Sequence, residues 1–190
     1  MQSTVLTSRR LRLRPWSVDD AEAAARIFGE GEVAKWLTPA MSRVPDVAAM
    51  RSVLEAWLAE VDRLVPPLGR WAVELAPTQD GSAGGEPGTV IGAVALLPLP
   101  PGGEDAEIAW QTGPEFQGHG YATEAANTLI RWAFSAGLPE VFAVSRPANR
   151  AGARVAERLG MEWVGQTDKY YGLTLAVHRA RPGDLPPAAG

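Results

Sequence analysis

Hydrophobic and polar residues alternate along several short stretches of the chain, and this alternation predicts β-strands. Between Thr7 and Arg14, leucines alternate with arginines at the period of a half-buried strand. Other apolar or alternating runs predict strands at residues 71–75, 89–97, 107–112, 141–145, 162–167 and 173–179. Gly- and Pro-rich segments at 76–88 and 98–103 are expected to form exposed turns between them. Strands separated by such turns favour an antiparallel meander leading into the strand at 107–112.

Other segments between these predicted strands have apolar residues at helical spacing. Ser17 is expected to cap a helix over residues 18–28, and a short helical turn is expected at 33–37. From Asp46 to Val65, apolar residues recur at helical spacing and predict a long amphipathic helix, in which Trp57 is interpreted as a core residue. The whole pattern predicts one α/β domain over residues 1–181, followed by a flexible tail at 182–190.

The most informative stretch runs from the strand at 107–112 into a helix that begins near Ala122. Gly113-Pro114 breaks the strand, and Gly118 and Gly120 allow the backbone to bend and to approach a ligand closely. The N–H groups at the start of the helix have no partner within it and lie at the positive end of the helix dipole. The sequence therefore predicts a site for a phosphate or pyrophosphate group.

This stretch resembles a known family. Gln117-x-x-Gly120-x-Ala122 is similar to the Q/R-x-x-G-x-G/A motif of the GNAT superfamily, whose members transfer acyl groups from acyl-coenzyme A to amines. Residues 149–161 resemble the family's N-x-x-S-x-R-V-x-E-K-L-G-F segment. Residues 11–16 resemble the first strand of the branch that includes ribosomal-protein N-terminal acetyltransferases. The resemblance covers about residues 6–181.

The resemblance implies a fold and a reaction. The fold would be the GNAT acyltransferase fold: a mixed, mostly antiparallel, six- to seven-stranded sheet with helices on both faces and splayed central strands. The reaction would move an acyl group, most simply acetyl from acetyl-CoA, to a primary amine without a metal. Protein N-terminal amines, small polyamines and aminoglycoside-like molecules all remain open as acceptors, and a homodimer is a family expectation.

The resemblance also implies roles for individual residues. Contacts with the pantetheine arm are implied for Trp110, Gln111, Thr112 and Asn149. Contacts with the pyrophosphate are implied for the backbone of Gln117, Gly118, His119, Gly120, Tyr121, Ala122 and Thr123. Tyr170 and Tyr171, between the last two strands, are expected to shape the acceptor pocket.

Amine acylation sets its own chemical requirements. An alkyl ammonium has a pKa near ~10.4, so the site needs a general base or a desolvating pocket. Glu107 is the candidate base, acting through a water; alternatively it only orients the acceptor or pairs with an arginine. The chain has no cysteine, which rules out an acetyl-cysteine intermediate and favours direct attack in a ternary complex.

Two departures from the family pattern support a different function. Gly152 stands where the family has serine, and Ala156 stands where some relatives place a tyrosine acid. No leaving-group acid is therefore assigned, and the tyrosines at 121, 170 and 171 remain alternatives. The same departures favour a non-catalytic acyl-CoA sensor or partner-binding module of the same fold.

Composition and charge exclude other classes. A net charge of −4 argues against a general nucleic-acid binder. No apolar run approaches the roughly 20 residues of a membrane helix, and no signal segment is evident, so a cytoplasmic protein without a membrane partner is expected. Gly118-x-Gly120-x-x-Thr123 lacks the third glycine of a dinucleotide site, and no Walker A motif occurs.

The remaining charged residues are interpreted as surface features. The arginines at 10, 12 and 14 are expected to form the solvated face of a strand in preference to a basic patch. His119 is expected to face solvent or phosphate, and His178 is expected on the surface. Two distant histidines without cysteines predict no metal site.

Overall fold

The computed structural model describes residues 4–29, 31, 41, 44–78 and 84–185. In chain order the elements are β1 (Leu6–Thr7), β2 (Leu11–Pro15), η1 (Val18–Asp20), α1 (Ala21–Phe28), α3 (Val47–Glu60), η2 (Val61–Arg63), β3 (Gly69–Leu75), β4 (Val90–Pro98), β5 (Ala106–Thr112), η3 (Pro114–Phe116), α4 (Tyr121–Ser135), β6 (Val141–Ser145), α5 (Arg150–Arg158), β7 (Glu162–Thr167) and β8 (Leu175–Ala180). The helical turn predicted at 33–37 lies outside the described residues.

The described strands form one mixed, mostly antiparallel sheet in the order β1-β2-β3-β4-β5-β6-β8-β7. This confirms the predicted α/β class, but the sheet has eight strands, not six to seven. The extra strand arises because the segment expected as one strand from Thr7 to Arg14 folds back on itself. Leu6 pairs with Leu13 across a tight turn, so the segment forms the β1–β2 hairpin.

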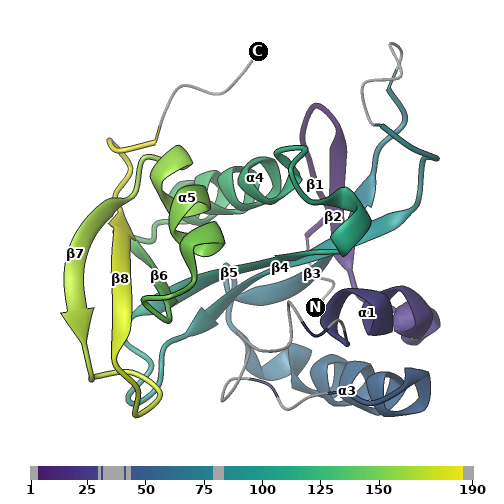
Figure 1. The fold of residues 1–190 in the computed structure, drawn as a ribbon, viewed down its shortest axis with the longest axis horizontal. Coiled ribbons are helices and arrows are strands. Elements are labelled where there is room, and N and C mark those ends of the chain that lie inside the picture. The colour runs from purple at the N-terminus through teal and green to yellow at the C-terminus, as the bar shows by residue number, and fades with distance from the viewer. Residues whose placement is uncertain (1–3, 30, 32–40, 42–43, 79–83, 186–190) are drawn as a thin grey trace.

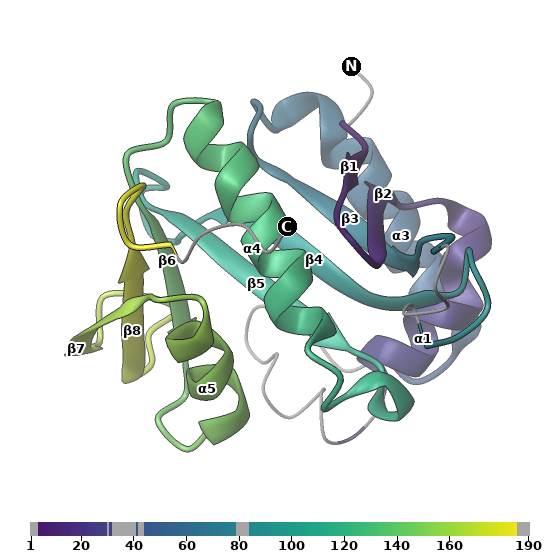
Figure 2. The same ribbon diagram turned by 90° about the horizontal axis from the view of Figure 1, so that it is seen from above.

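The sheet opens at its centre. β4 and β5 are joined by seven residue pairs from Gly92↔Thr112 to Pro98↔Ala106, whereas the parallel strands β5 and β6 share the single pair Glu107↔Phe142. Beyond that pair β6 has no partner on β5, although it pairs with β8 along its whole length, from Val141↔Ala180 to Ser145↔Ala176 (Figure 2). The predicted splay of the central strands is confirmed, and it separates the backbones that flank the cavity described below.

Helices cover both faces of the sheet (Figure 1). On one face, α4 packs on the largest apolar cluster, which includes Trp71, Leu96 and Ile108. On the other face, α1 and α3 pack over small residues such as Ala72 and Ala93. Since successive side chains of a strand point to opposite faces, alternate residues of β3, β4 and β5 supply the two layers. None of the described helices is long and apolar enough to cross a membrane.

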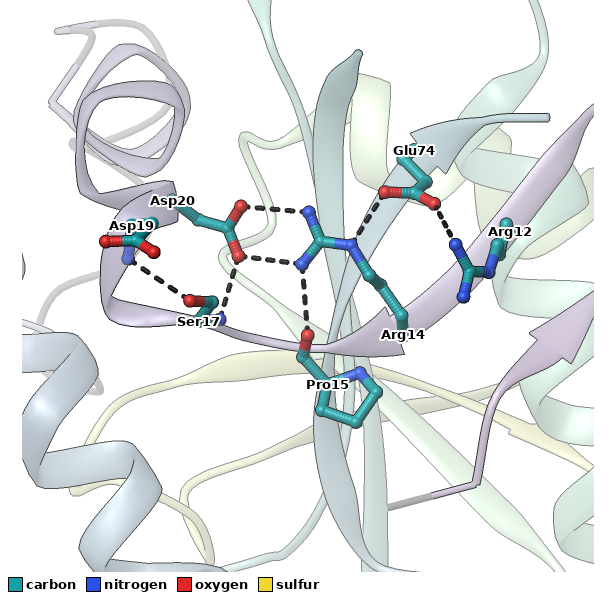
Figure 3. A network of polar contacts seen from close by, with 7 residues as sticks. All are labelled: Arg12, Arg14, Pro15, Ser17, Asp19, Asp20 and Glu74. Atoms are coloured by element: carbon teal, nitrogen blue, oxygen red, sulfur yellow. Dashed lines mark hydrogen bonds and ion pairs between the residues drawn. The ribbon is translucent and has the colours of Figure 1, made fainter. Parts of the chain in front are cut away.

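The arginines of β2 form only part of the solvated face that the sequence predicts. Glu74 of β3 lies opposite Arg12 and accepts hydrogen bonds from Arg12 Nη1 at 2.9 Å and from Arg14 Nε at 2.6 Å (Figure 3). Arg14 also holds Asp20 with both terminal nitrogens, at 2.7 and 2.9 Å. The prediction holds for Arg12, which keeps 48% of its side chain exposed, but fails for Arg14, which keeps 20%. Arg14 is covered because β3, distant in sequence, and the nearby η1 both supply carboxylates to it.

The predicted cap at Ser17 is present, and Asp46 supplies a further cap that the sequence analysis did not name. Ser17 and Asp20 form a reciprocal capping box at η1, and Asp46 Oδ1 accepts from the backbone N–H of Ala49 at the start of α3. The start of the expected tail returns to the domain: the backbone N–H of Arg181 donates to Asp184, and Leu185 packs against the main apolar cluster. Residues 186–190 lie outside the described part, so their flexibility stays a prediction.

Candidate active site

A cavity of about 600 Å³ occupies the opening between β5 and β6 and reaches both faces of the sheet. Its volume lies in the range of small-molecule sites. Residues of α4 and α5 line one half, which we call the turn half. Side chains of α1 and α3, together with β3 and β4, line the other, which we call the aromatic half. Glu107 on β5 lies where the halves meet.

The glycine turn before α4 forms the end of the turn half. Gly118 and Gly120 have φ of 81° and 82°, in the left-handed region that favours glycine. A Cβ at Gly118 would have no neighbour within 4 Å, so the space over the turn is open. At the N-terminus of α4, the backbone N–H of Glu124 donates to the Gly120 carbonyl. The N–H groups of Ala122 and Thr123, which precede Glu124, have no acceptor within the helix, and this geometry suits an anion.

Most of the residues predicted to bind the cofactor meet in this half. The cavity is lined by Trp110, Gln111, Thr112, Gln117, Gly118, Gly120, Tyr121, Ala122, Thr123 and Asn149. His119 is the exception, because its exposed ring stacks on Tyr121 at a centroid distance of 5.7 Å and does not line the cavity. The Gln117 side chain donates to the Thr112 carbonyl at 3.2 Å, which ties the turn to the end of β5.

A clasp from the β1–β2 hairpin holds the glycine turn. The Glu124 carboxylate accepts from the Ser8 hydroxyl at 2.7 Å, from Arg10 N–H at 2.8 Å and from Arg10 Nε at 2.7 Å. The Arg10 guanidinium also donates to the His119 carbonyl at 3.1 Å and lies 4.6 Å from the centroid of the buried Tyr121 ring. These charge-assisted contacts restrain the turn before any ligand arrives.

Asn149 has a structural task besides lining the cavity. It is the N-cap of α5, and its Oδ1 accepts from Gly152 N–H at 3.0 Å. A Cβ at Gly152 would lie 2.9 Å from Asn149 Nδ2. A serine at 152 would therefore require the Asn149 side chain to shift.

Glu107 faces into the cavity from β5. Burial there raises the pKa of its carboxyl to about 7, while the hydrogen bond from Tyr171 acts in the opposite direction. The Tyr171 hydroxyl donates to Glu107 Oε2 at 2.6 Å, and Tyr171 has φ of 53°. Burial, first, and the neighbouring carboxylate raise the pKa of Tyr171, so the phenol keeps its proton. At neutral pH Glu107 can thus hold or release a proton.

The two tyrosines predicted at the acceptor pocket lie in different environments. Tyr171 lines the cavity beside Glu107, but Tyr170 does not. Tyr170 is buried in a small cluster with Leu99, and its hydroxyl donates to Asp105 at 2.7 Å. Lys169 pairs with the same carboxylate at 2.7 Å and holds its pKa below the usual value. The Asp105 contacts fix the turn that positions Tyr171.

The aromatic half contains residues that the sequence pattern did not single out as functional. Trp16, Phe28 and Trp57 line it, and their ring centroids lie 5.5–6.2 Å apart. Trp57 packs against the core cluster as predicted, yet it also forms a cavity wall. Aromatic residues at helical spacing carry no signal that separates these two roles.

Three further cavity residues were missed or misplaced. His178 was expected on the surface but is buried at the cavity wall, because β8 lies between β6 and β7 in the sheet. Burial lowers its pKa. Arg154 and Arg158 of α5 also line the turn half. Their spacing of four residues places them on one helix face, and that signal could have identified them.

Comparison with known proteins assigns this arrangement to a family. Residues 10–162 match the family model described as "Acetyltransferase (GNAT) domain". The chain is similar to "Uncharacterized N-acetyltransferase YoaA" of Bacillus subtilis, at 26% identity over 168 residues covering 87% of each protein. It is also similar to "FsC-acetyl coenzyme A-N(2)-transacetylase" of Aspergillus fumigatus, at 28% identity over 167 residues covering 84% of this chain and 65% of that protein.

Solved structures share the fold. "Mycobacterium smegmatis RimJ in complex with CoA-disulfide" superposes with a TM-score of 0.75 at 20% identity, covering 99% of this chain and 93% of that one. A putative ribosomal-protein-serine acetyltransferase from Vibrio cholerae gives a TM-score of 0.73 at 20% identity, covering 96% and 100%. These neighbours are consistent with the branch suggested by residues 11–16.

Proposed function

This chain belongs to the GNAT acetyltransferase family, and from that premise we propose that it acetylates a primary amine by direct attack in a ternary complex with acetyl-CoA. Glu107 is the proposed general base, and the glycine turn is the proposed pyrophosphate site. When bound, acetyl-CoA supplies an acyl group activated as a thioester.

The turn half fits acetyl-CoA. The open space over Gly118 admits a phosphate close to the backbone, and the α4 dipole favours its negative charge. Arg154 and Arg158 add positive charge along the same half. The splayed edge of β5 from Trp110 to Thr112 presents backbone groups that β6 does not pair, which suits an extended pantetheine arm and an oxyanion.

Glu107 carries the proposal, because a carboxyl with a pKa of about 7 stands where the two halves of the cavity meet. A base of that pKa is half ionised near neutral pH and can accept a proton from an ammonium, directly or through one water. The amine nitrogen then bonds to the acyl carbon, the carbon–sulfur bond breaks, and the sulfur leaves as a thiolate. The second proton of the attacking nitrogen passes to this thiolate or to water, which leaves a neutral amide. A thiol pKa near ~8.5 allows this departure without an assigned acid.

Calorimetric titration with acetyl-CoA tests the cofactor site. Gly120→Trp is the test variant, and Gly137→Trp is the matched control, since Gly137 also has positive φ, at 97°, but lies past the other end of α4. Both substitutions strain the backbone by about 1–2 kcal/mol. We expect Gly120→Trp alone to weaken binding by roughly 100-fold or more. Equal binding by both variants and the native chain would refute the site.

A non-catalytic sensor of the same fold is the alternative that this proposal must exclude. Such a protein would bind acetyl-CoA and lose that binding in Gly120→Trp, yet would acetylate no amine in a broad panel. The Glu107→Gln variant distinguishes the two, because only an enzyme has a turnover that depends on this carboxyl.

A further inference from the structure

The floor of the aromatic half is made of small side chains. Ala93 and Ala95 of β4 and Ala109 of β5 line the cavity, and Ala95 pairs with Ala109 across the two strands. Glu107 lies on the same face of β5 as Ala109, roughly 6–7 Å away along the strand. An acceptor whose nitrogen meets Glu107 would therefore lay its next few atoms over methyl groups.

The opposite wall is aromatic. Trp16 lies between β2 and η1, Phe28 on α1 and Trp57 on α3, and the three rings contact one another, with Phe28 and Trp57 packed edge to face at 77°. The Arg70 guanidinium lies 5.3 Å from the Trp57 ring centroid, so the cation–π position on this ring is already taken. Ala93 packs with Trp16 and Phe28 in one buried cluster, so the open part of this half lies beside Trp57 and over the half-buried Ala95 and Ala109. The apolar slot at that place suits a flat hydrocarbon group.

The charges of the slot favour a single positive charge on the acceptor. Among the described residues that line the cavity, Glu107 is the one carboxylate. Arg70, on the same sheet face, is cationic and pairs with Glu60 at 3.0 Å, so this pair adds no net negative charge. Each additional ammonium of a polycation would lose water without gaining a partner, which is costly.

We propose that the acceptor is a monocationic primary amine that carries a flat apolar or aromatic group two to three atoms from its nitrogen, and not a polyamine or an aminoglycoside. This inference rests on the proposed acetyltransferase function and names the substrate class of the same site. A free arylalkylamine and a peptide beginning with an aromatic residue share this chemistry.

An acceptor panel tests the class by measuring released thiol at saturating acetyl-CoA. The amines are phenethylamine, the peptide Phe-Gly-Gly-amide, spermidine and kanamycin. We expect kcat/KM for one of the first two to exceed that of either polycation by roughly 30-fold or more, about 2 kcal/mol. The better of the two identifies the free amine or the peptide as the source. A preference for spermidine or kanamycin overturns this inference alone. No transfer to any of the four, with acetyl-CoA binding intact, overturns the proposed function as well.

Two variants test the slot itself. Ala95→Leu fills it and Trp57→Ala removes one wall, and both should raise KM for the preferred aromatic acceptor roughly 10-fold while changing KM for ethylamine by less than about 3-fold. Ala48→Leu, at an exposed position of α3 outside the cavity, is the control with unchanged kinetics. Thermal unfolding confirms that each variant is folded. Equal losses for both amines in the two slot variants would overturn the inference.

Discussion

The two halves of the cavity are built by different means. The turn half is largely backbone: two left-handed glycines, the first amides of α4 and the edge of β5. The aromatic half is almost entirely side chain: three rings from separate segments of the chain, an alanine floor and one carboxylate. Glu107 is the point at which they meet.

This difference explains how the two halves depend on sequence. A site made of backbone needs only the residues that let the chain bend, and these lie within a few positions of one another. A site made of side chains accepts many residue types, as long as their shapes and charges suit the ligand. Cofactor binding is thus encoded locally, whereas acceptor choice is dispersed along the chain.

The largest expected effect comes from Glu107→Gln. This variant should impair the chemical step and leave cofactor binding in the turn half intact. We expect kcat to fall roughly 10²–10⁴-fold, because the base is lost, while acetyl-CoA affinity stays within about 3-fold. In the native enzyme kcat/KM should rise with pH around a pKa of about 7, and the variant should lack this rise. Glu115→Gln, on η3 outside the cavity, is the control. A variant that keeps more than about a third of native kcat would contradict the assigned base.

The second effect tests whether the Glu107 carboxyl is desolvated in the folded protein. Its folded pKa is raised from 4.5 to about 7, so the folded state binds the proton more tightly than the unfolded state does. The resulting stabilisation is complete below the unfolded pKa and is lost as pH rises through the folded pKa. Between about pH 5 and pH 8 the free energy of unfolding should drop by about 1–3 kcal/mol relative to Glu107→Gln. Urea titrations of both proteins measure this difference, and parallel pH profiles would show that the carboxyl is fully solvated.

The third effect concerns the support of the aromatic half. Arg14, held by Glu74 and Asp20, ties β2 to η1, and the chain between those elements carries Trp16 (Figure 3). Glu74→Gln should lower the free energy of unfolding by about 1–3 kcal/mol, because two guanidinium groups lose a shared partner at a position where only 8% of the Glu74 side chain is exposed.

An exposed ion pair provides the control for that experiment. Glu22 and Arg26 lie one turn apart on α1, with 77% and 56% of their side chains exposed. Glu22→Gln should cost less than about 0.5 kcal/mol. Equal losses for the two variants in urea unfolding would mean that the Glu74 network contributes no more than a surface pair.

The smallest effect concerns the clasp on the turn half. Arg10→Met removes the ion pair to Glu124 and the contact with the Tyr121 ring, but leaves the glycines in place. Loss of this pre-organisation, worth about 1 kcal/mol, should raise Kd for acetyl-CoA about 3–10-fold without changing kcat. Arg26→Met is the exposed control. A change in kcat without a change in Kd would mean that the clasp contributes to catalysis and not to cofactor binding.

Local patterns in the sequence predicted most of the secondary structure. The strands at 141–145 and 162–167 have the predicted bounds, and the predicted cap at Ser17 is present. Alternation and capping are local properties, because they follow from the period of one element and the needs of its first turn. The hairpin at residues 6–15 was missed because its turn around Ser8, Arg9 and Arg10 contains no glycine or proline.

The predicted site residues divide in the same way. The turn residues from Gln117 to Thr123 line one end of the cavity together because they are adjacent along the chain. The His119 side chain is the exception and lies outside the cavity. Tyr170 and Tyr171 are neighbours in sequence, yet only Tyr171 reaches the cavity. Their separation depends on Asp105, more than sixty residues earlier, which no local pattern connects to them.

The sequence by itself therefore determined the family, the layers of the fold and the backbone turn that suits a pyrophosphate, because each follows from short-range spacing. Tertiary structure alone decided that Glu107 would be desolvated, that Arg14 would be paired and that three distant rings would face one alanine floor. Burial, charge pairing and cavity shape are properties of surfaces brought together from separate parts of the chain, and they arise only when the sheet and its two helical layers have assembled.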